Sequence, residues 1–137
     1  MDLTRFLDAQ ARTWPSPLDE IVSGRKHGHW MWYIFPQLRG LGQSAMAQLY
    51  GIADLDEARD YVRHDLLGAR LKEISKAMLT HVGTPARAIL GPVDTMKLRS
   101  SMTLFHAAKG GQVFGQVLEA FFDGQPCRPT LDMTGGS

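Results

Sequence analysis

Proline and glycine interrupt this 137-residue sequence about every ten to fifteen residues, and many of the interruptions bring a residue that can cap a helix. Between them, large apolar residues recur at the three- and four-residue spacing of one helix face. Helices this short are marginal alone, so they must share buried surface. The sequence therefore predicts a single all-α domain, residues 1–137, of about seven to nine short helices.

The caps and breakers place most of the helices. Ser44, Asp54 and Asp65 are expected N-caps, and Asp65 would open the longest helix. Residues 126–137 are rich in proline, glycine and polar residues, so we expect a loosely packed tail with at most one short turn. The main helices are predicted over residues 4–13, 17–22, 45–50, 55–64, 66–82, 86–90, 95–108 and 112–122.

The densest aromatic stretch is Trp30–Phe35, WMWYIF. Six large apolar residues in a row fit either a buried strand or one to two turns of buried helix, and periodicity does not separate these. The neighbouring segments are predicted to be helical and no second strand is evident, so we expect a short helix or irregular segment that Pro36 ends. We predict that this run is the hub on which the short helices pack, because aromatic side chains bury the most area.

Composition excludes several functional classes. The formal net charge is +1, so no overall field attracts nucleic acid or an anionic membrane, and any attraction for anions must be local. Cys127 is the only cysteine, so there is no disulfide framework, and we interpret it as an incidental thiol in a reducing cytoplasm. No signal-peptide pattern and no membrane-length apolar run is present. We therefore expect a cytoplasmic location.

The first polar cluster flanks the hub. Lys26 and Arg39 could bind a phosphate or carboxylate group, with His29 as a hydrogen-bond donor or a catalytic acid/base. The alternative is a solvated basic loop, with His29 hydrogen-bonded at the edge of the core. The cluster consists of Arg25, Lys26, His27 and His29 before the hub, and Gln37 and Arg39 after it.

The second polar cluster lies on the helix predicted for residues 95–108, which Asp94 is expected to open. Lys97, Ser100 and Ser101 share one face by their spacing, and Arg99 lies on another. The rest of this helix is apolar, so its cations would need partners if they pointed inward. One interpretation is an anion pocket built jointly with the first cluster. The other is that the cations reach solvent and the hydroxyls bond back to carbonyls.

Other chemistries have little support. His27 and His29 have no third ligand at a recognised spacing, so no metal site is predicted. No nucleophile motif surrounds Cys127 or any serine. The Trp30–Phe35 run is too continuous for an exposed base-stacking platform, so nucleic acid is not an expected partner. The sequence indicates no cofactor.

Several blocks of the sequence are similar to one bacterial family. They resemble domain-of-unknown-function family 1810, whose members are sometimes called calpastatin and include an all-α mycobacterial protein. The blocks are FLDAQ, GRKHGHWMWYIFPQLRGLG, YGI, LGARL, KLRSSMTLF and FFDG. The resemblance implies an all-α fold and supplies no activity or cofactor. It places the family's shared polar positions at Gln10, Lys26, His29, Gln37, Lys97, Arg99, Ser100 and Ser101.

Two functions remain open. The first is an enzyme or binding domain for a phosphorylated or nucleotide-like small molecule, by a remote analogy with N-glycosidases that act on ADP-ribose-like substrates. If it is catalytic, His29 would be the acid/base and Asp94 its partner. The second is a helical adaptor without chemistry. The residues that would line a pocket are Gln10, Lys26, Trp30, Trp32, Gln37, Arg39, Lys97, Arg99, Ser100 and Ser101.

Overall fold

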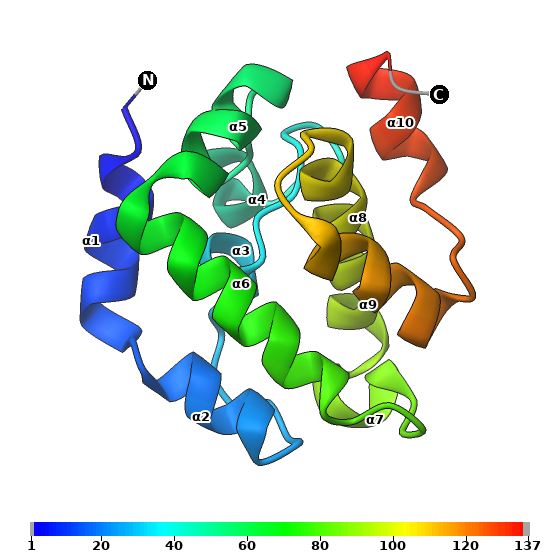
Figure 1. The fold of residues 1–137 in the computed structure, drawn as a ribbon. Helices are drawn as coiled ribbons and strands as arrows, with labels where there is room; N and C mark the ends of the chain where they lie inside the picture. Colours follow the sequence, from blue (N-terminus) through cyan, green and yellow to red (C-terminus); the bar gives the residue numbers. More distant parts are fainter. Residues whose placement is uncertain (1, 136–137) are drawn as a thin grey trace.

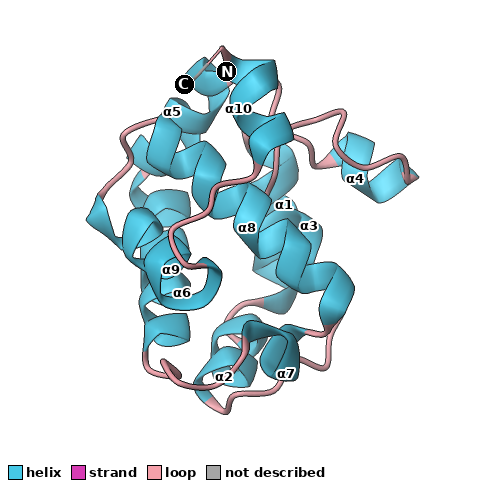
Figure 2. Cartoon of the chain, turned by 90° about the vertical axis from the view of Figure 1, so that its right-hand side faces the viewer, coloured by secondary structure: helices cyan, strands magenta, loops and turns pink. Residues whose placement is uncertain are grey.

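The computed structural model describes residues 2–135, and these form ten α-helices and no strand (Figures 1 and 2). The predicted all-α fold is confirmed. Helix α6 crosses the front of the molecule in Figure 1, with α1 on one side and α9 on the other. The helices are α1 (Thr4–Thr13), α2 (Ser16–Val22), α3 (Met31–Ile34), α4 (Ala45–Leu49), α5 (Leu55–Arg63), α6 (Asp65–Leu79), α7 (Ala86–Leu90), α8 (Pro92–Ala107), α9 (Gln112–Phe122) and α10 (Arg128–Thr134).

Side-chain caps begin three of these helices. Ser44 accepts a hydrogen bond from the backbone N–H three residues further on, at 3.1 Å, and Asp54 does the same at 2.9 Å. Both caps were predicted. The predicted cap of α6 was wrong: Asp65 is its first residue, and Nδ1 of His64 accepts from two backbone N–H groups at 3.2 and 3.3 Å. A neutral imidazole nitrogen thus takes the place of the usual carboxylate or hydroxyl.

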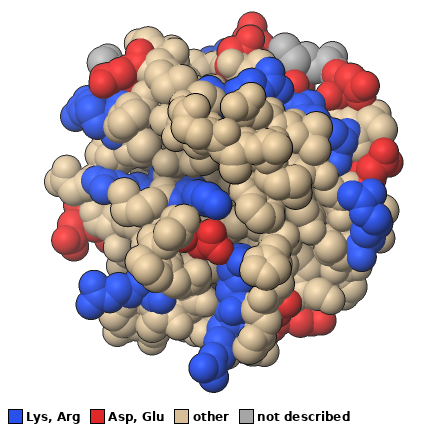
Figure 3. Space-filling view, turned by 180° about the vertical axis from the view of Figure 1, so that it is seen from behind, with Lys and Arg blue, Asp and Glu red and all other residues tan. Residues whose placement is uncertain are grey.

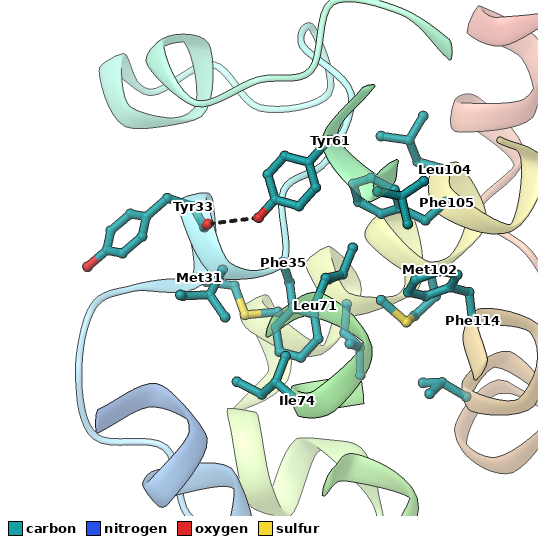
Figure 4. Close-up of a cluster of buried hydrophobic side chains, with 14 of the residues drawn as sticks. Met31, Tyr33, Phe35, Tyr61, Leu71, Ile74, Met102, Leu104, Phe105 and Phe114 are labelled. Atoms are coloured by element: carbon teal, nitrogen blue, oxygen red, sulfur yellow. Dashed lines mark hydrogen bonds between the residues drawn. The ribbon is translucent and has the colours of Figure 1, made fainter. Parts of the chain in front are cut away.

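The Trp30–Phe35 run is a single turn of buried helix, α3, with a flanking residue at each end. Its side chains belong to one apolar core that also includes α6, α8 and α9 (Figure 4). Aromatic rings continue this core: the centroids of Tyr61 and Phe105 are 5.4 Å apart, and those of Phe105 and Phe114 are 5.7 Å apart. The hub predicted from the sequence is therefore part of the core. The longer helices α6 and α8 contribute more buried residues to that core than α3 does.

The C-terminal segment packs more closely than the sequence suggested. Residues 128–134 form α10, which lies against α8, and Thr130 is fully buried. The segment that leads into α10 is fixed against α8 by the backbone N–H of Cys127, which donates to Oγ1 of Thr103 at 2.9 Å. Residues 136 and 137 of the predicted loose tail lie outside the described residues. Within residues 2–135, no helix is both long enough and apolar enough to cross a membrane.

Candidate functional site

The two basic clusters of the sequence meet at one carboxylate. Nζ of Lys26 lies 2.8 Å from Oδ2 of Asp94, and Nζ of Lys97 lies 3.6 Å from Oδ1 of the same residue. The Lys26 ammonium also donates to the carbonyl of Gly28. We call Lys26, Asp94 and Lys97 the lysine–aspartate cluster. It holds two ammonium groups for one carboxylate, so its charge is unbalanced in favour of anions.

The position of Asp94 follows from where α8 begins. The helix was predicted to start after Asp94, but it starts at Pro92, which follows Gly91 with a positive φ of 83°. Proline suits the first turn of a helix because its missing N–H is not needed there. Asp94 therefore lies inside the first turn, where a carboxylate is favoured by the helix dipole. From there it reaches Lys97 one turn later and Lys26 from the loop before α3.

Each lysine of the cluster also lies over an indole ring. Nζ of Lys26 is 5.0 Å from the ring centroid of Trp30, and Nζ of Lys97 is 4.9 Å from that of Trp32. These distances are in the range of cation–π contacts. Trp30 is buried and Trp32 is half-buried, so only Trp32 offers ring surface to a ligand.

Glu20 fixes the loop that carries Lys26, and the sequence did not identify it. Its Oε1 accepts hydrogen bonds from the backbone N–H of His27 (2.6 Å), the backbone N–H of Gly28 (2.9 Å) and the indole N–H of Trp30 (3.0 Å). Burial acts to raise the pKa of Glu20, but these hydrogen bonds and the charge of His27 outweigh it, so the pKa lies below the ordinary value. The carboxylate therefore stays ionised and holds the loop.

A small hollow opens beside Lys97. Trp32, Gln37 and Lys97 line it together with apolar side chains of the α3 and α4 regions, and its volume is about 10 Å³, the room that one water molecule takes. Typical ligand pockets hold about 300–1,000 Å³, so this hollow is a shallow dent in the surface and does not enclose a ligand. On the face shown in Figure 3, basic and acidic side chains lie close together, so this face is not uniformly positive. Any anion preference here is local.

The two arginines predicted for the site do not join the cluster. Arg39 is exposed and donates to the carbonyls of Gln48 (3.1 Å) and Gly51 (3.0 Å). Arg99 donates to the carbonyl of Gln125 at 2.8 Å. Both guanidinium groups thus hold backbone carbonyls of other segments.

The two serines of α8 also lie apart from Lys97. The hydroxyl of Ser100 is 3.1 Å from the carbonyl of Met96 and 3.3 Å from the sulfur of Cys127, which places it with the C-terminal segment. Ser101 is fully buried, and its hydroxyl has no hydrogen-bond partner within the described part of the chain.

The remaining predicted residues have different roles. Gln10 is buried, and its Nε2 donates to the carbonyl of Tyr33 (2.9 Å) and the hydroxyl of Tyr61 (3.0 Å), so it supports the core. Burial raises the pKa of Tyr61, which stays neutral. The side chain of His29 is exposed, and within residues 2–135 no hydrogen bond or ion pair joins it to Asp94 or another residue.

Comparison with known proteins places the chain in a family. A family model described as "Protein of unknown function (DUF1810)" matches residues 1–134. The chain belongs to the DUF1810 family. It is similar to the crystal structure of the conserved hypothetical protein Rv1873 from Mycobacterium tuberculosis, with 45% sequence identity and a TM-score of 0.95 over 99% of this chain and 98% of that chain. A search of curated proteins found no match.

The resemblance predicted for the DUF1810 family is therefore confirmed. Among residues 2–135 of this DUF1810 protein, no group of three or more His, Cys, Asp or Glu side chains is arranged to hold a metal ion. A much broader concave surface is an open groove of about 1280 Å³ along α8, α9 and the segment leading into α10. The sequence did not indicate this groove, because its shape depends on how these consecutive segments pack against one another.

Proposed function

We propose that this DUF1810 protein binds a small anionic molecule of the phosphorylated or nucleotide-like class at the lysine–aspartate cluster. One observation carries the proposal: Lys26 and Lys97, which are 71 residues apart in the sequence, converge on the single carboxylate of Asp94. An ammonium group is a common ligand for phosphate oxygens. With two ammonium groups and one carboxylate, the cluster retains the capacity to attract an anion.

The two lysines would contribute differently. The Lys26 side chain is 9% exposed and sits 2.8 Å from Asp94, so it is a fixed part of the cluster. The Lys97 side chain is 22% exposed and its distance to Asp94 is 3.6 Å, so its ion pair is weaker and its ammonium is free to turn toward a ligand. Lys97 is therefore the residue we expect to contact the anion directly.

The anionic group would lie over the mouth of the small hollow beside Lys97. Gln37 can donate a side-chain amide hydrogen there, and Trp32 provides an aromatic wall for a base or sugar that extends outward. Because the hollow is small, most of a nucleotide-like ligand would lie on the surface, which predicts modest affinity. Hydrolysis of such a ligand, with His29 as acid/base, stays a prediction, as does the cytoplasmic location.

A thermal-shift panel tests the proposal. The ligands are inorganic phosphate, ribose 5-phosphate, ADP and ADP-ribose, added to the wild type, Lys97→Met and Arg99→Met. A ligand that binds the native state raises the Tm, so at least one should stabilise the wild type. We expect Lys97→Met to abolish the shift and Arg99→Met, the matched loss of a cation from the same helix, to retain it. No shift with any ligand, or the same shift in Lys97→Met, would contradict the proposal.

The second candidate function is a helical adaptor. The observation that favours it is the broad groove of α8 and α9, about 1280 Å³ in volume, against about 10 Å³ for the hollow beside Lys97. A surface of this kind suits a peptide or helix of a partner protein better than it suits a phosphate group. Failure of every ligand in the panel would favour this second candidate.

A further inference from the structure

Cys127 lies in a polar environment that an incidental thiol does not need. It precedes α10, is partly exposed, and is the only cysteine of the chain. Its neighbours Pro126 and Arg128 line the broad groove, together with Thr103 of α8. The backbone at Cys127 is held to α8 through the hydroxyl of Thr103. The backbone of Cys127 is therefore held beside a broad groove that the residues on either side of it line.

One hydroxyl near the sulfur has a choice of acceptors. Oγ of Ser100 lies 3.1 Å from the carbonyl of Met96 and 3.3 Å from Sγ of Cys127. A hydroxyl has one hydrogen, so it donates to only one of the two well at a time. When the thiol is protonated, the hydrogen can stay on the carbonyl, and when the sulfur is ionised it can turn to the sulfur, which is then the stronger acceptor.

The hydroxyl of Thr130 is a second donor that could serve the sulfur. Thr130 is 0% exposed, and its Oγ1 has no hydrogen-bond partner of good geometry among the described residues. A buried hydroxyl left without a partner destabilises the folded state. The polar atom that it can serve is the sulfur one turn earlier, because both the hydroxyl and the backbone N–H of Thr130 act on Cys127. An ionised sulfur would give this hydroxyl an acceptor.

We infer that Cys127 is a reactive thiolate and a modification site, which forms a mixed disulfide with a low-molecular-weight thiol supplied as its disulfide. The Cys127 thiolate attacks one sulfur of the disulfide, a new S–S bond forms, and the old S–S bond breaks. The second sulfur leaves as a thiolate with the bonding electron pair and takes a proton from water. The chain has no second cysteine to displace the adduct, so a further thiol must reverse it.

The surroundings support both parts of the inference. Burial acts to raise the pKa of Cys127, but the donor groups of Ser100 and Thr130 and the charge of Arg99 outweigh it, so the pKa lies below the ordinary value. The groove beside Cys127 has room for the body of a small thiol, and its Lys109 and Arg128 suit a thiol that carries carboxylates.

Reaction kinetics test the inference on the full chain. The rate of reaction with 5,5′-dithiobis(2-nitrobenzoic acid) is measured from pH 5 to 10 for the wild type, Ser100→Ala, Thr130→Val and Thr134→Val, with N-acetylcysteine as the reference thiol. Thr134→Val is the control because the Thr134 hydroxyl bonds only to carbonyls of the same helix. Circular dichroism checks that each variant is folded, and using two variants keeps the test valid if one is not.

The wild type should show an apparent pKa below that of N-acetylcysteine. Thr130→Val and Ser100→Ala should each raise it and slow the reaction at pH 7 by about three- to tenfold, while Thr134→Val should not. Incubation with oxidised glutathione should add one glutathionyl group to the wild type by intact mass, and dithiothreitol should remove it. An apparent pKa equal to that of N-acetylcysteine, no change in either variant, or no adduct would overturn the inference.

Discussion

Helix α8 has two polar sides that differ in what holds them together. On one side, Lys97 shares the carboxylate of Asp94 with Lys26, so this side depends on a single ionised group. On the other, Arg99 and Thr103 hold the segment before α10 through hydrogen bonds to its backbone, with no carboxylate involved. Each residue turns a helix by about 100°, so positions two apart, such as 97 and 99, point in nearly opposite directions.

The difference shows why a basic stretch of sequence is not by itself one site. The lysine side gathers charge around a hollow, whereas the arginine is used to anchor the C-terminal segment. The first side is therefore a candidate for ligand binding, and the second is primarily structural apart from the sulfur of Cys127. If this division is right, the two sides should respond differently to substitution.

The largest effect should come from Asp94. Asp94→Ala leaves Lys26, whose side chain is 9% exposed, without its ion-pair partner. An unpaired, partly buried charge is costly, so we expect the free energy of unfolding in urea to fall by about 2–4 kcal/mol. Asp56→Ala is the control, because Asp56 pairs with Arg59 on the surface and should cost less than about 1 kcal/mol. Equal losses would show that Asp94 has no special role.

Glu20 should have the next largest effect. Glu20→Ala leaves the N–H groups of His27, Gly28 and Trp30 without their common acceptor. Water can satisfy some of them, so we expect a loss of about 1–3 kcal/mol, measured by urea denaturation. The loop that carries Lys26 should also loosen, which amide hydrogen exchange at residues 25–29 would detect. Unchanged exchange there would contradict the role given to Glu20.

A smaller effect is expected on the arginine side. Thr103→Val removes the acceptor for the N–H of Cys127 while keeping the shape of the side chain, so the free energy of unfolding should fall by about 1 kcal/mol. Thr95→Val is the matched control, because the hydroxyl of Thr95 bonds only to a carbonyl of the preceding turn. If both variants lose the same stability, the contact of α8 with the C-terminal segment is not what Thr103 contributes.

The smallest effect should be the pH dependence that Glu20 gives to stability. Its folded-state pKa lies below the ordinary value of 4.5, so its contribution is fully present above that value and is lost as the pH falls through the folded-state pKa. The Tm of the wild type should therefore fall more steeply between pH 5 and pH 3 than that of Glu20→Gln. If the Tm of the wild type and the Tm of Glu20→Gln fell in parallel as the pH is lowered, Glu20 would not be preferentially ionised in the folded chain.

Much of the fold could be predicted from local signals. Ser44 and Asp54 cap helices where the sequence placed them, and α9 spans the predicted residues. Three helix starts were missed for local reasons as well, and α2 begins at Ser16, one residue earlier than predicted. His64 is an uncommon cap, and Pro92 in the first turn moved the start of α8 ahead of Asp94. The Gly91-Pro92 pair could have indicated that start, because proline favours the first turn of a helix.

The candidate site could be predicted only in part. Charge in an otherwise apolar helix indicated that Lys97 needs a partner, and the structure supplies Asp94 with Lys26. The role of Glu20 could not be predicted, because it depends on how the loop of residues 25–29 folds back onto α2. The burial of Thr130 could not be predicted either, because it depends on how α10 packs against α8. Arg99 was assigned to the pocket from its charge in an apolar helix and from the family resemblance. The sequence does not show that its guanidinium donates to the carbonyl of Gln125 instead.

A titration followed by ¹H–¹⁵N NMR tests the central proposal most directly. ADP-ribose and inorganic phosphate are added in turn to the ¹⁵N-labelled chain, and the Trp32 indole signal is identified from Trp32→Phe. The proposal predicts saturable shifts of the Trp32 indole and of the amides of Gln37 and Lys97, with the indole of Trp14 unchanged. No saturable shift with either ligand, or shifts confined to α9 and α10, would contradict it.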